Sequence, residues 1–251
     1  MTPQRILVLG GTGLIGRAII ARLAARGARI TAPTRRLARA RPLLPLPTVT
    51  VIEADIHDDA ALATLVRGHD AVINLVGILH GRGGSPYGAD FARAHVELPR
   101  RLVAACEAAG VQRLVHMSAL GADGAAPLPS MYLRSKADGE QAVMRSSLDW
   151  TVLRPSVVFG PDDRFLNLFA QLQRFAPVMP LARADTRFQP VHIDDVAQAF
   201  INALDRADTI GRGYELAGPR TYTLRELVKL AGRRAGCERP VIRLPDMAGR
   251  L

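Results

Sequence analysis

Lysine is almost absent from this 251-residue chain, which has only Lys136 and Lys229 although its formal net charge is +10. Arginine therefore supplies nearly all of the positive charge. The arginines are spread through helix-like segments, where we interpret them mostly as solvated helix faces. No basic run is interleaved with the aromatic residues that stack on bases, so nucleic acid is not an expected partner. The basic surface favours other anionic partners, namely nucleotides, acidic lipids or acidic proteins.

Cysteine is equally scarce, because the chain has only Cys106 and Cys237, without a CxxC pattern. This usage predicts no disulfide framework and a reducing compartment. The six histidines do not cluster with cysteines or carboxylates, so no metal site is predicted. No apolar run approaches the roughly 18–20 residues of a membrane span. A strand-like stretch already begins at Arg5, which leaves no room for a signal peptide, and we expect a cytoplasmic protein.

Apolar strand-like runs alternate with amphipathic helical stretches along most of the chain. This alternation is typical of an α/β protein with a parallel sheet. Glycines at positions 27 and 110 follow two of the helical stretches and predict where those helices stop. The predicted strands cover residues 5–10, 28–31, 49–54, 71–76, 113–118, 150–158 and 213–218.

The glycine-rich stretch GGTGLIGR, residues 10–17, directly follows the first predicted strand and opens the first predicted helix. Glycines there allow a tight turn and a close approach of the backbone to a pyrophosphate, which then lies at the helix N-terminus. In this strand–turn–helix context the pattern predicts dinucleotide binding and a Rossmann-type doubly wound sheet. The predicted cofactor contacts here are Gly10, Gly11, Thr12, Gly13, Leu14, Ile15 and Gly16.

The end of the second predicted strand indicates which dinucleotide binds. An acid about 20 residues after the glycine loop would hold the ribose hydroxyls of NAD. This chain instead has Thr34 followed by Arg35 and Arg36, and guanidinium groups bind a 2′-phosphate well. We therefore expect NADP(H) to be favoured over NAD(H), with Arg35 and Arg36 as contacts. The alternative is that both arginines are merely exposed to solvent.

One of the two lysines lies four residues after a tyrosine, in the segment YLRSK at 132–136. On a helix, Tyr132 and Lys136 would share one face. An ammonium group beside a phenol favours the phenolate, so Lys136 is expected to lower the pKa of Tyr132 and make it a general acid/base. The alternative is an ordinary tyrosine and lysine on an amphipathic surface helix. A second helical stripe, at residues 165–176, is predicted to be core of a smaller lobe and not a membrane-binding face.

With these motifs in order, residues 4–231 resemble the short-chain dehydrogenase/reductase superfamily, and more closely its extended, epimerase/dehydratase-like branch. Within it, the run from VGILHGRG to RPSVVFGPDDRF is most similar to the atypical group that contains the nucleotide-binding accessory subunit of respiratory complex I. The resemblance implies a Rossmann domain at 1–158 and a small C-terminal substrate lobe at 159–251, interleaved with returning Rossmann elements at about 188–218. It also implies further cofactor contacts at Asp55, Ile56, Leu75, Val76, Gly77, Pro155 and Val157, beside Tyr132 and Lys136.

The supporting catalytic positions depart from the family pattern. Ser118 takes the place of the first serine of the family's strand end and is a candidate to orient substrate, but Leu120 occupies the usual position of the catalytic hydroxyl. His95 takes the place of the helical asparagine. The sequence therefore leaves three functions open: an oxidoreductase acting on a carbonyl or alcohol of unknown identity, a non-catalytic NADP(H)-binding accessory or sensor protein in peripheral contact with a membrane complex, and a nucleotide-sugar epimerase or dehydratase.

The last residues, 238–251, read as the beginning of a further strand and helix. Because relatives generally continue beyond this point, the substrate lobe is expected to be incomplete in this chain.

Overall fold

The computed structural model describes residues 4–123 and 128–244 and divides the chain into two compact units. The first, which we call the sheet unit, comprises Met1–Pro155 and Asp194–Leu216. The second, the small unit, comprises Ser156–Ile193 and Ala217–Leu251. The chain thus leaves the sheet unit after Pro155, returns to it at Asp194, and leaves it again after Leu216.

The sheet unit is built on a single seven-stranded sheet in which every pairing is parallel. The spatial order is β11-β6-β5-β4-β1-β2-β3, so the predicted doubly wound parallel fold is confirmed. Each of the seven predicted strand segments forms one of these strands. Their bounds are β1 Arg5–Leu9, β2 Arg29–Thr34, β3 Val49–Glu53, β4 Ala71–Asn74, β5 Arg113–Met117, β6 Asp149–Pro155 and β11 Arg212–Leu216.

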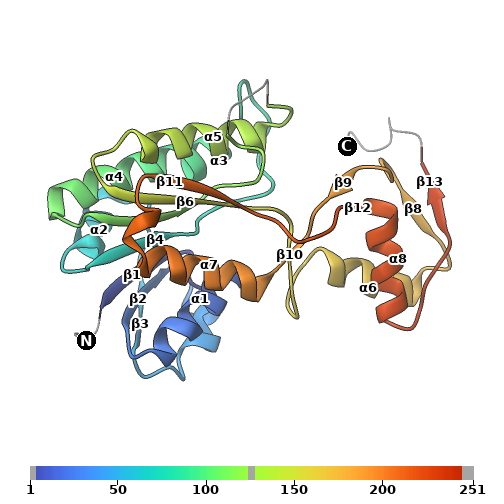
Figure 1. Ribbon diagram of the computed structural model, residues 1–251, viewed down its shortest axis with the longest axis horizontal. Helices are drawn as coiled ribbons and strands as arrows, with labels where there is room; N and C mark the ends of the chain where they lie inside the picture. Colours follow the sequence, from blue (N-terminus) through green and yellow to red (C-terminus); the bar gives the residue numbers. More distant parts are fainter. Residues whose placement is uncertain (1–3, 124–127, 245–251) are drawn as a thin grey trace. The chain divides into compact units, whose positions relative to one another are not determined.

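Helices cover both faces of this sheet (Figure 1). The helices α2, α4 and α5 enclose one apolar core against it, whereas α1 and α7 lie on the opposite face and are joined by the ion pairs Arg22–Asp194 and Arg26–Asp205. Gly27 and Gly110 follow α1 and α4 with positive φ angles, as predicted. The helices are α1 Leu14–Ala25, the 3₁₀ helix η1 Leu37–Leu43, α2 Asp59–Val66, α3 Ala89–Phe91, the π-helix η2 Ala92–Glu97, α4 Leu98–Ala109, α5 Met131–Met144, α7 Ile193–Asp205 and the 3₁₀ helix η3 Ala207–Thr209.

The strand order reverses between β1 and β4, which are direct neighbours with Leu9 opposite Asn74. Loops that leave the carboxyl ends of these two strands turn to opposite sides, and open α/β sheets bind ligands in the resulting crevice. The glycine loop after β1 and the segment after β4 both lie at this edge. The topology therefore brings together two of the segments that the sequence singled out.

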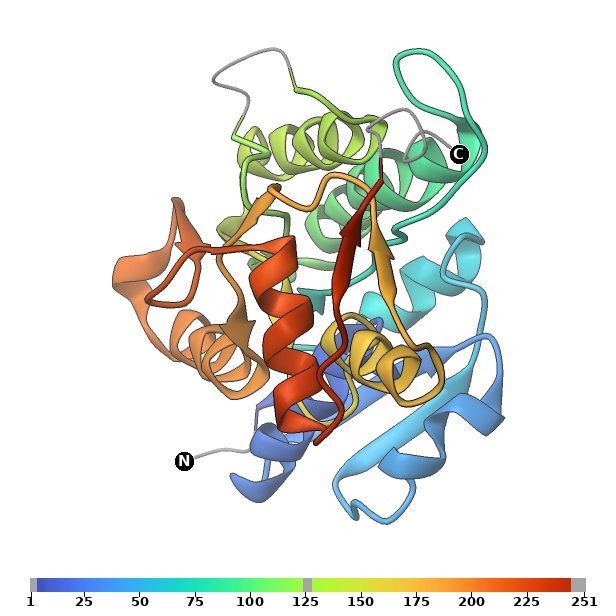
Figure 2. The same cartoon turned by 90° about the vertical axis from the view of Figure 1, so that its right-hand side faces the viewer.

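The small unit is organised around two helices, α6 (Leu166–Phe175) and α8 (Leu224–Arg234), which pack against each other (Figure 2). The amide of Gln173 joins them, donating to Val228 O at 2.8 Å and accepting from Arg239 N at 3.1 Å. Among the described residues of this unit, three two-stranded sheets accompany the helices: β7 Val158–Phe159 with β10 Val191–His192, β9 Arg187–Phe188 with β12 Tyr222–Thr223, and β8 Met179–Leu181 with β13 Val241–Arg243. Of the expected final strand and helix, β13 is the strand, and residues 245–251 lie outside the described part of the chain.

The prediction that the 165–176 stripe is core was only partly right. Phe169 and Ala176 pack against the small unit's core, but Leu168 and Leu172 are exposed. Phe175, one turn after Leu172, is 88% exposed. A helical period identifies apolar positions on a helix, but it does not tell which of them a neighbouring element covers.

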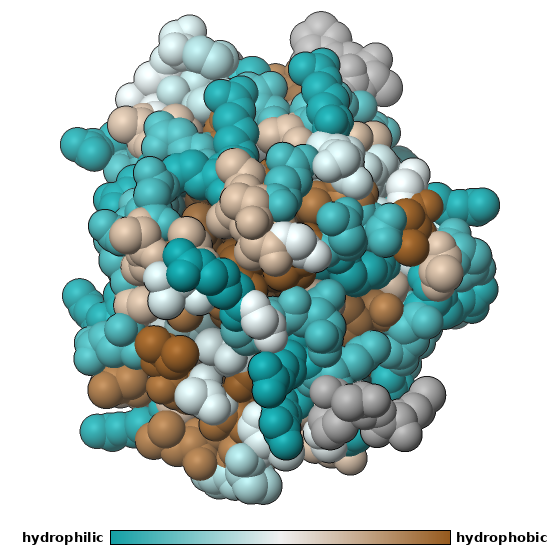
Figure 3. Space-filling model, turned by 90° about the vertical axis from the view of Figure 1, so that its left-hand side faces the viewer, coloured by the Kyte–Doolittle hydropathy of each residue, from teal (hydrophilic) through white to brown (hydrophobic). Residues whose placement is uncertain are grey.

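Within residues 4–123 and 128–244, no helix combines the length and the apolarity that a membrane crossing requires. One face of the molecule is coloured by hydropathy in Figure 3, where hydrophilic side chains cover most of the surface and hydrophobic ones form patches between them.

Candidate functional site

The glycine loop forms a tight turn in which Gly10 and Gly16 have no room for a side chain. Gly10 has a φ of +79°, and a Cβ added to Gly16 would lie 2.6 Å from Gly10 O. Helix α1 begins directly after Gly13, without a side-chain cap and without an acidic residue in its first turn. Its first N–H groups therefore have no competing carboxylate, and a pyrophosphate fits here on geometry and on charge. The predicted contacts Gly10, Gly11, Thr12, Gly13, Leu14, Ile15 and Gly16 all belong to this turn or to the first helical turn.

A basic cluster surrounds an acid at the ends of β2 and β3. Thr34 is buried, while Arg35 and Arg36 are exposed. The Asp55 carboxylate accepts a hydrogen bond from His57 N at 3.0 Å and lies 3.6 Å from Arg93. The hydrogen bond from the His57 backbone, followed by the charges of His57, Arg93 and Arg35, lowers the pKa of Asp55. Arg35 is thus close enough to act electrostatically on the carboxylate that the resemblance assigns to the adenine end.

The segment after β4 is held by hydrogen bonds that its backbone N–H groups donate. Leu75 N donates to Leu9 O at 3.0 Å and Val76 N donates to the Asn74 side chain at 3.2 Å. A Cβ added to Gly77 would lie 3.6 Å from His95 Nε2 and 4.0 Å from Lys136 Nζ. The predicted contact Gly77 therefore lies next to the lysine of the YLRSK segment. Leu75 lies against Gly10 of the glycine loop, whereas Val76 and Ile56 are partly buried against the core of the sheet unit.

Lys136 is a buried cation in the second turn of α5. Its residue is 2% exposed, and its ammonium group donates to Met117 O at 2.6 Å, at the carboxyl end of β5. Burial lowers the pKa of Lys136 to about 8, and the negative charge of Glu140 opposes this shift. Glu140 is itself buried and pairs with Arg154 on β6. A surface lysine, the alternative that the sequence left open, would show none of these features.

Tyr132 lies one helical turn before Lys136, at the beginning of α5. Ser130 caps this helix by accepting from Leu133 N at 3.1 Å. The Tyr132 ring meets the rings of His95 and Phe91 edge-on, with centroids 5.5 and 6.5 Å apart. Burial raises the pKa of Tyr132, and this direction is opposite to the expected one. The prediction failed because it considered the neighbouring charge and not the desolvation of the phenol among aromatic rings.

Two buried polar side chains lie at the carboxyl end of β5, His116 within the strand and Ser118 directly after it. Among the described residues, neither His116 Nε2 nor Ser118 Oγ has a hydrogen-bond partner. Leaving such a group unpaired costs about 1–3 kcal/mol. The Leu120 N donates to Pro155 O at 3.0 Å, and the leucine offers no hydroxyl at the position where the resemblance implies one. Ser118 is therefore the hydroxyl that this strand end contributes.

His95 had been assigned only as a replacement for an asparagine, and the sequence did not indicate its contacts. Its Nε2 accepts from Ile78 N at 2.9 Å, and its Nδ1 lies 2.8 Å from Ser135 Oγ. It lies inside the π-helix η2, a local feature that periodicity in the sequence does not reveal. Contacts were also missed for Arg93 and His57, for which no motif provided a signal.

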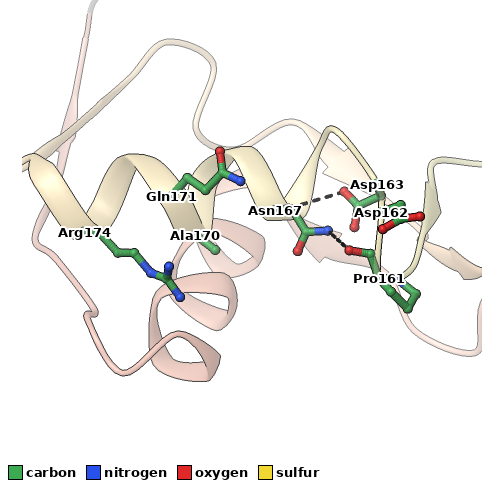
Figure 4. A pocket seen from close by; sticks show the side chains of 7 residues that line it. All are labelled: Pro161, Asp162, Asp163, Asn167, Ala170, Gln171 and Arg174. Carbon is green, nitrogen blue, oxygen red and sulfur yellow. Dashed lines mark hydrogen bonds between the residues drawn. The ribbon is translucent and has the colours of Figure 1, made fainter. Parts of the chain in front are cut away.

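The small unit has its own shallow pocket of about 390 Å³ beside α6 (Figure 4). The Asp163 carboxylate accepts from the N–H groups of Phe165 and Leu166, and the Asn167 side chain donates to Pro161 O at 2.8 Å. These bonds hold the turn that leads into the helix. The residues that line the pocket are Pro161, Asp162, Asp163, Asn167, Ala170, Gln171 and Arg174.

Two predicted cofactor contacts lie in different units. Val157 belongs to the small unit, where its carbonyl accepts from Val191 N, whereas Pro155 ends β6 in the sheet unit.

The sequence profile of the NAD dependent epimerase/dehydratase family matches residues 6–217, and the chain belongs to this family. The predicted resemblance is thereby confirmed. The chain also has the fold of a dTDP-glucose 4,6-dehydratase from Streptomyces venezuelae determined with NAD bound. The TM-score is 0.85 at 24% identity, over 98% of this chain and 86% of that one.

Among curated proteins, the chain is similar to NADH dehydrogenase (ubiquinone) 1 alpha subcomplex subunit 9 of mouse mitochondria, with 34% identity over 228 residues. That match covers 88% of this chain and 59% of the mouse protein, so the chain spans about three fifths of that relative's length. A ceramide reductase of Caulobacter vibrioides is 32% identical over 250 residues, which are 96% of this chain and 74% of the reductase.

Proposed function

We propose that the protein is an NADP(H)-dependent oxidoreductase that interconverts a carbonyl compound and an alcohol. The observation that carries this proposal is the burial of Lys136 one helical turn after Tyr132, beside the segment that follows β4. A buried ammonium group costs free energy unless its charge is used, and perturbed titratable groups of this kind are concentrated at functional sites. Similarity to a reductase over nearly the whole chain supports the same conclusion.

The nicotinamide dinucleotide, when bound, supplies or accepts the hydride. The chain's own residues carry out the proton transfer. In the reducing direction the Tyr132 hydroxyl donates its proton to the substrate oxygen, and its raised pKa keeps it protonated until that step. The positive charge of Lys136 stabilises the phenolate that is left, and the ammonium also binds ribose hydroxyls. Ser118 Oγ, buried and unpaired within the described residues, orients the substrate.

The preference for NADP(H) rests on the absence of an acid at the end of β2. Arg35 is exposed and close enough to Asp55 to lower the pKa of its carboxyl group, so it borders the adenine end of the site. A guanidinium at this place attracts a 2′-phosphate, whereas NADH offers it only a neutral hydroxyl.

A non-catalytic nucleotide-binding protein is the second candidate. Leu120 in place of a hydroxyl favours it, as does His95, whose ring nitrogens are both engaged by Ile78 and Ser135. The similarity to subunits of mitochondrial NADH dehydrogenase points in the same direction. In this case Tyr132 and Lys136 serve to bind the ribose.

For either candidate we propose peripheral contact with an anionic membrane surface or membrane complex. The small unit contains twelve of the chain's basic residues and six acidic ones, so more than half of the net charge of +10 lies in the smaller part of the chain. Its helix α6 exposes Leu168, Leu172 and Phe175 at helical spacing. Basic charge beside an apolar helical face is the composition of interfacial helices.

Tyr132→Phe separates the two candidates, because it keeps the ring and removes the hydroxyl. For an oxidoreductase, NADPH affinity should change by no more than the equivalent of about 1 kcal/mol, while turnover falls by roughly 10²–10⁴. The assays are titration calorimetry with NADPH and NADPH oxidation against a panel of aldehydes and ketones. If the wild-type protein binds NADPH but oxidises none with any carbonyl, the accessory function replaces the catalytic one.

A further inference from the structure

The imidazole of His95 joins two segments that are far apart in the sequence. Its Nε2 is 2.9 Å from Ile78 N, in the segment after β4, and its Nδ1 is 2.8 Å from Ser135 Oγ in α5. Both His95 and Ser135 are buried, at 1% and 0% exposure. Bulk water does not compete for hydrogen bonds in such surroundings, and a buried polar group that lacks its hydrogen bond costs free energy.

The directions of these hydrogen bonds follow from the donors available. The Ser135 hydroxyl has a single proton, which it donates to Tyr132 O at 2.8 Å. Its oxygen must then accept from His95 Nδ1–H, so Nε2 is unprotonated and accepts from Ile78 N–H. Burial, followed by the charge of Lys136, lowers the pKa of His95 to about 3, so the ring stays neutral at ordinary pH. The result is one chain of hydrogen bonds, from Ile78 through His95 and Ser135 to Tyr132.

Two features of the backbone enforce this arrangement. The π-helix η2 shifts the helical register at residues 92–97, and His95 is one of its buried residues. Helix α5 approaches η2 so closely that a Cβ on Gly139 would lie 1.7 Å from His95 O. Glycine is therefore required at that position, and the two helices are held at a fixed separation. π-helical turns often occur where function needs a side chain that a regular helix would misdirect.

The segment after β4, to which His95 is hydrogen-bonded, lies on one side of the nucleotide crevice. In the sheet, β4 and β5 lie on one side of β1, while β2 and β3 lie on the other. The glycine loop after β1 would hold the pyrophosphate, and Arg35 and Asp55 follow β2 and β3 on the adenylate side. The nicotinamide half of the ligand must then extend over β4 and β5, towards Gly77 and Lys136.

We propose that His95 is a positioning residue, which fixes the Gly77–Ile78 segment against the first turn of α5 and thereby shapes the nicotinamide side of the dinucleotide site. This inference rests on the proposed dinucleotide binding. With both ring nitrogens engaged in hydrogen bonds and the ring neutral, His95 is a static brace and does not shuttle protons for Tyr132. It would affect the half of the ligand that contacts β4 and β5, and not the adenylate half.

The test compares a dinucleotide with its adenylate half. The probes are NADPH and 2′,5′-ADP, or NADH and 5′-ADP if the protein prefers NADH, each titrated calorimetrically. His95→Phe keeps an aromatic ring beside Phe91 and Tyr132 and removes both hydrogen bonds. We expect dinucleotide affinity to fall by about 5- to 30-fold, the effect of one or two lost buried hydrogen bonds. Affinity for the adenylate half should stay within twofold.

His95→Gln is the matched control, because its amide can accept from Ile78 N–H and donate to Ser135 Oγ. It should restore most of the dinucleotide affinity. Ser135→Ala removes a single link and covers the case in which His95→Phe does not fold; it should weaken dinucleotide binding about threefold and spare the adenylate half. Equal losses for both probes, or unchanged dinucleotide binding by both His95→Phe and Ser135→Ala, would overturn the inference. If the wild-type protein binds neither probe, the proposed function itself fails, and that outcome is distinct.

Discussion

Replacing Lys136 with methionine should remove nucleotide binding without lowering the stability of the protein at neutral pH. The residue is 2% exposed, and methionine has a similar length and no charge. If Lys136 instead stabilised the fold, its replacement would lower the free energy of unfolding at neutral pH. This variant therefore distinguishes a residue kept for function from one kept for structure.

The magnitude follows from the pKa of Lys136, which burial lowers from 10.5 to about 8. The unfolded chain binds this proton more tightly than the folded one, so protonation favours unfolding wherever the pH is below the unfolded value. By linkage the cost is about 3 kcal/mol at pH 7 and about 1.5 kcal/mol at pH 9.5. The hydrogen bond to Met117 O returns about 1.5–3 kcal/mol. At pH 7 the two effects nearly cancel.

Urea denaturation of wild type and Lys136→Met, at pH 7 and at pH 9.5, measures the difference in the free energy of unfolding between the two proteins at each pH. The wild type should gain about 1.5–2 kcal/mol relative to the variant as the pH rises between these values. Other titrating groups cancel in the comparison, because both proteins share them. A variant that is more than 2 kcal/mol less stable at pH 7, by the same amount at both pH values, would refute the reasoning, since Lys136 would then be an ordinary stabilising cation.

Three further outcomes are expected. Gly16→Ala should abolish detectable dinucleotide binding in calorimetry, because its Cβ would lie 2.6 Å from Gly10 O; Gly83→Ala, where nothing lies within 4 Å, is the control. Arg35→Ala should weaken NADPH binding by about 1–3 kcal/mol and leave NADH binding unchanged, and equal losses for both would contradict the 2′-phosphate assignment. Cosedimentation with vesicles containing anionic lipid should be reduced by Phe175→Ser and by high salt, and the proposed membrane contact is wrong if neutral vesicles bind the protein equally well.

The sheet could be predicted because its signals are local. The runs that became β1, β4 and β5 are short, apolar and bounded by polar or glycine residues, and central strands of a parallel sheet are buried on both faces. The glycine loop was equally readable, since Gly10 has a positive φ angle and Gly16 comes against the backbone of Gly10 and Gly11, a few residues earlier in the sequence. Such features depend on little beyond their own neighbourhood in the sequence.

The features that were missed depend on partners distant in sequence. Leu168 and Leu172 fit a buried helical stripe as well as Phe169 does, and only the packing of α6 against α8 determines which of them is covered. Burial raises the pKa of Tyr132, and the rings that lie against it, Phe91 and His95, come from α3 and η2. Neither could be deduced from spacing along one element.

Three local conflicts with stability lie close together in this protein. Lys136 is a buried cation with a depressed pKa. Close by, His116 Nε2 in β5 and Ser118 Oγ directly after this strand are buried without partners among the described residues. Each of these groups costs on the order of 1–3 kcal/mol, a large fraction of the stability of an ordinary domain. A fold that needed only a core at this position could use apolar residues, as the neighbouring Leu114 and Val115 do. Because stabilising replacements are easy to find at sites without a function, polar groups that remain buried and unsatisfied together mark the place where the chain binds or reacts.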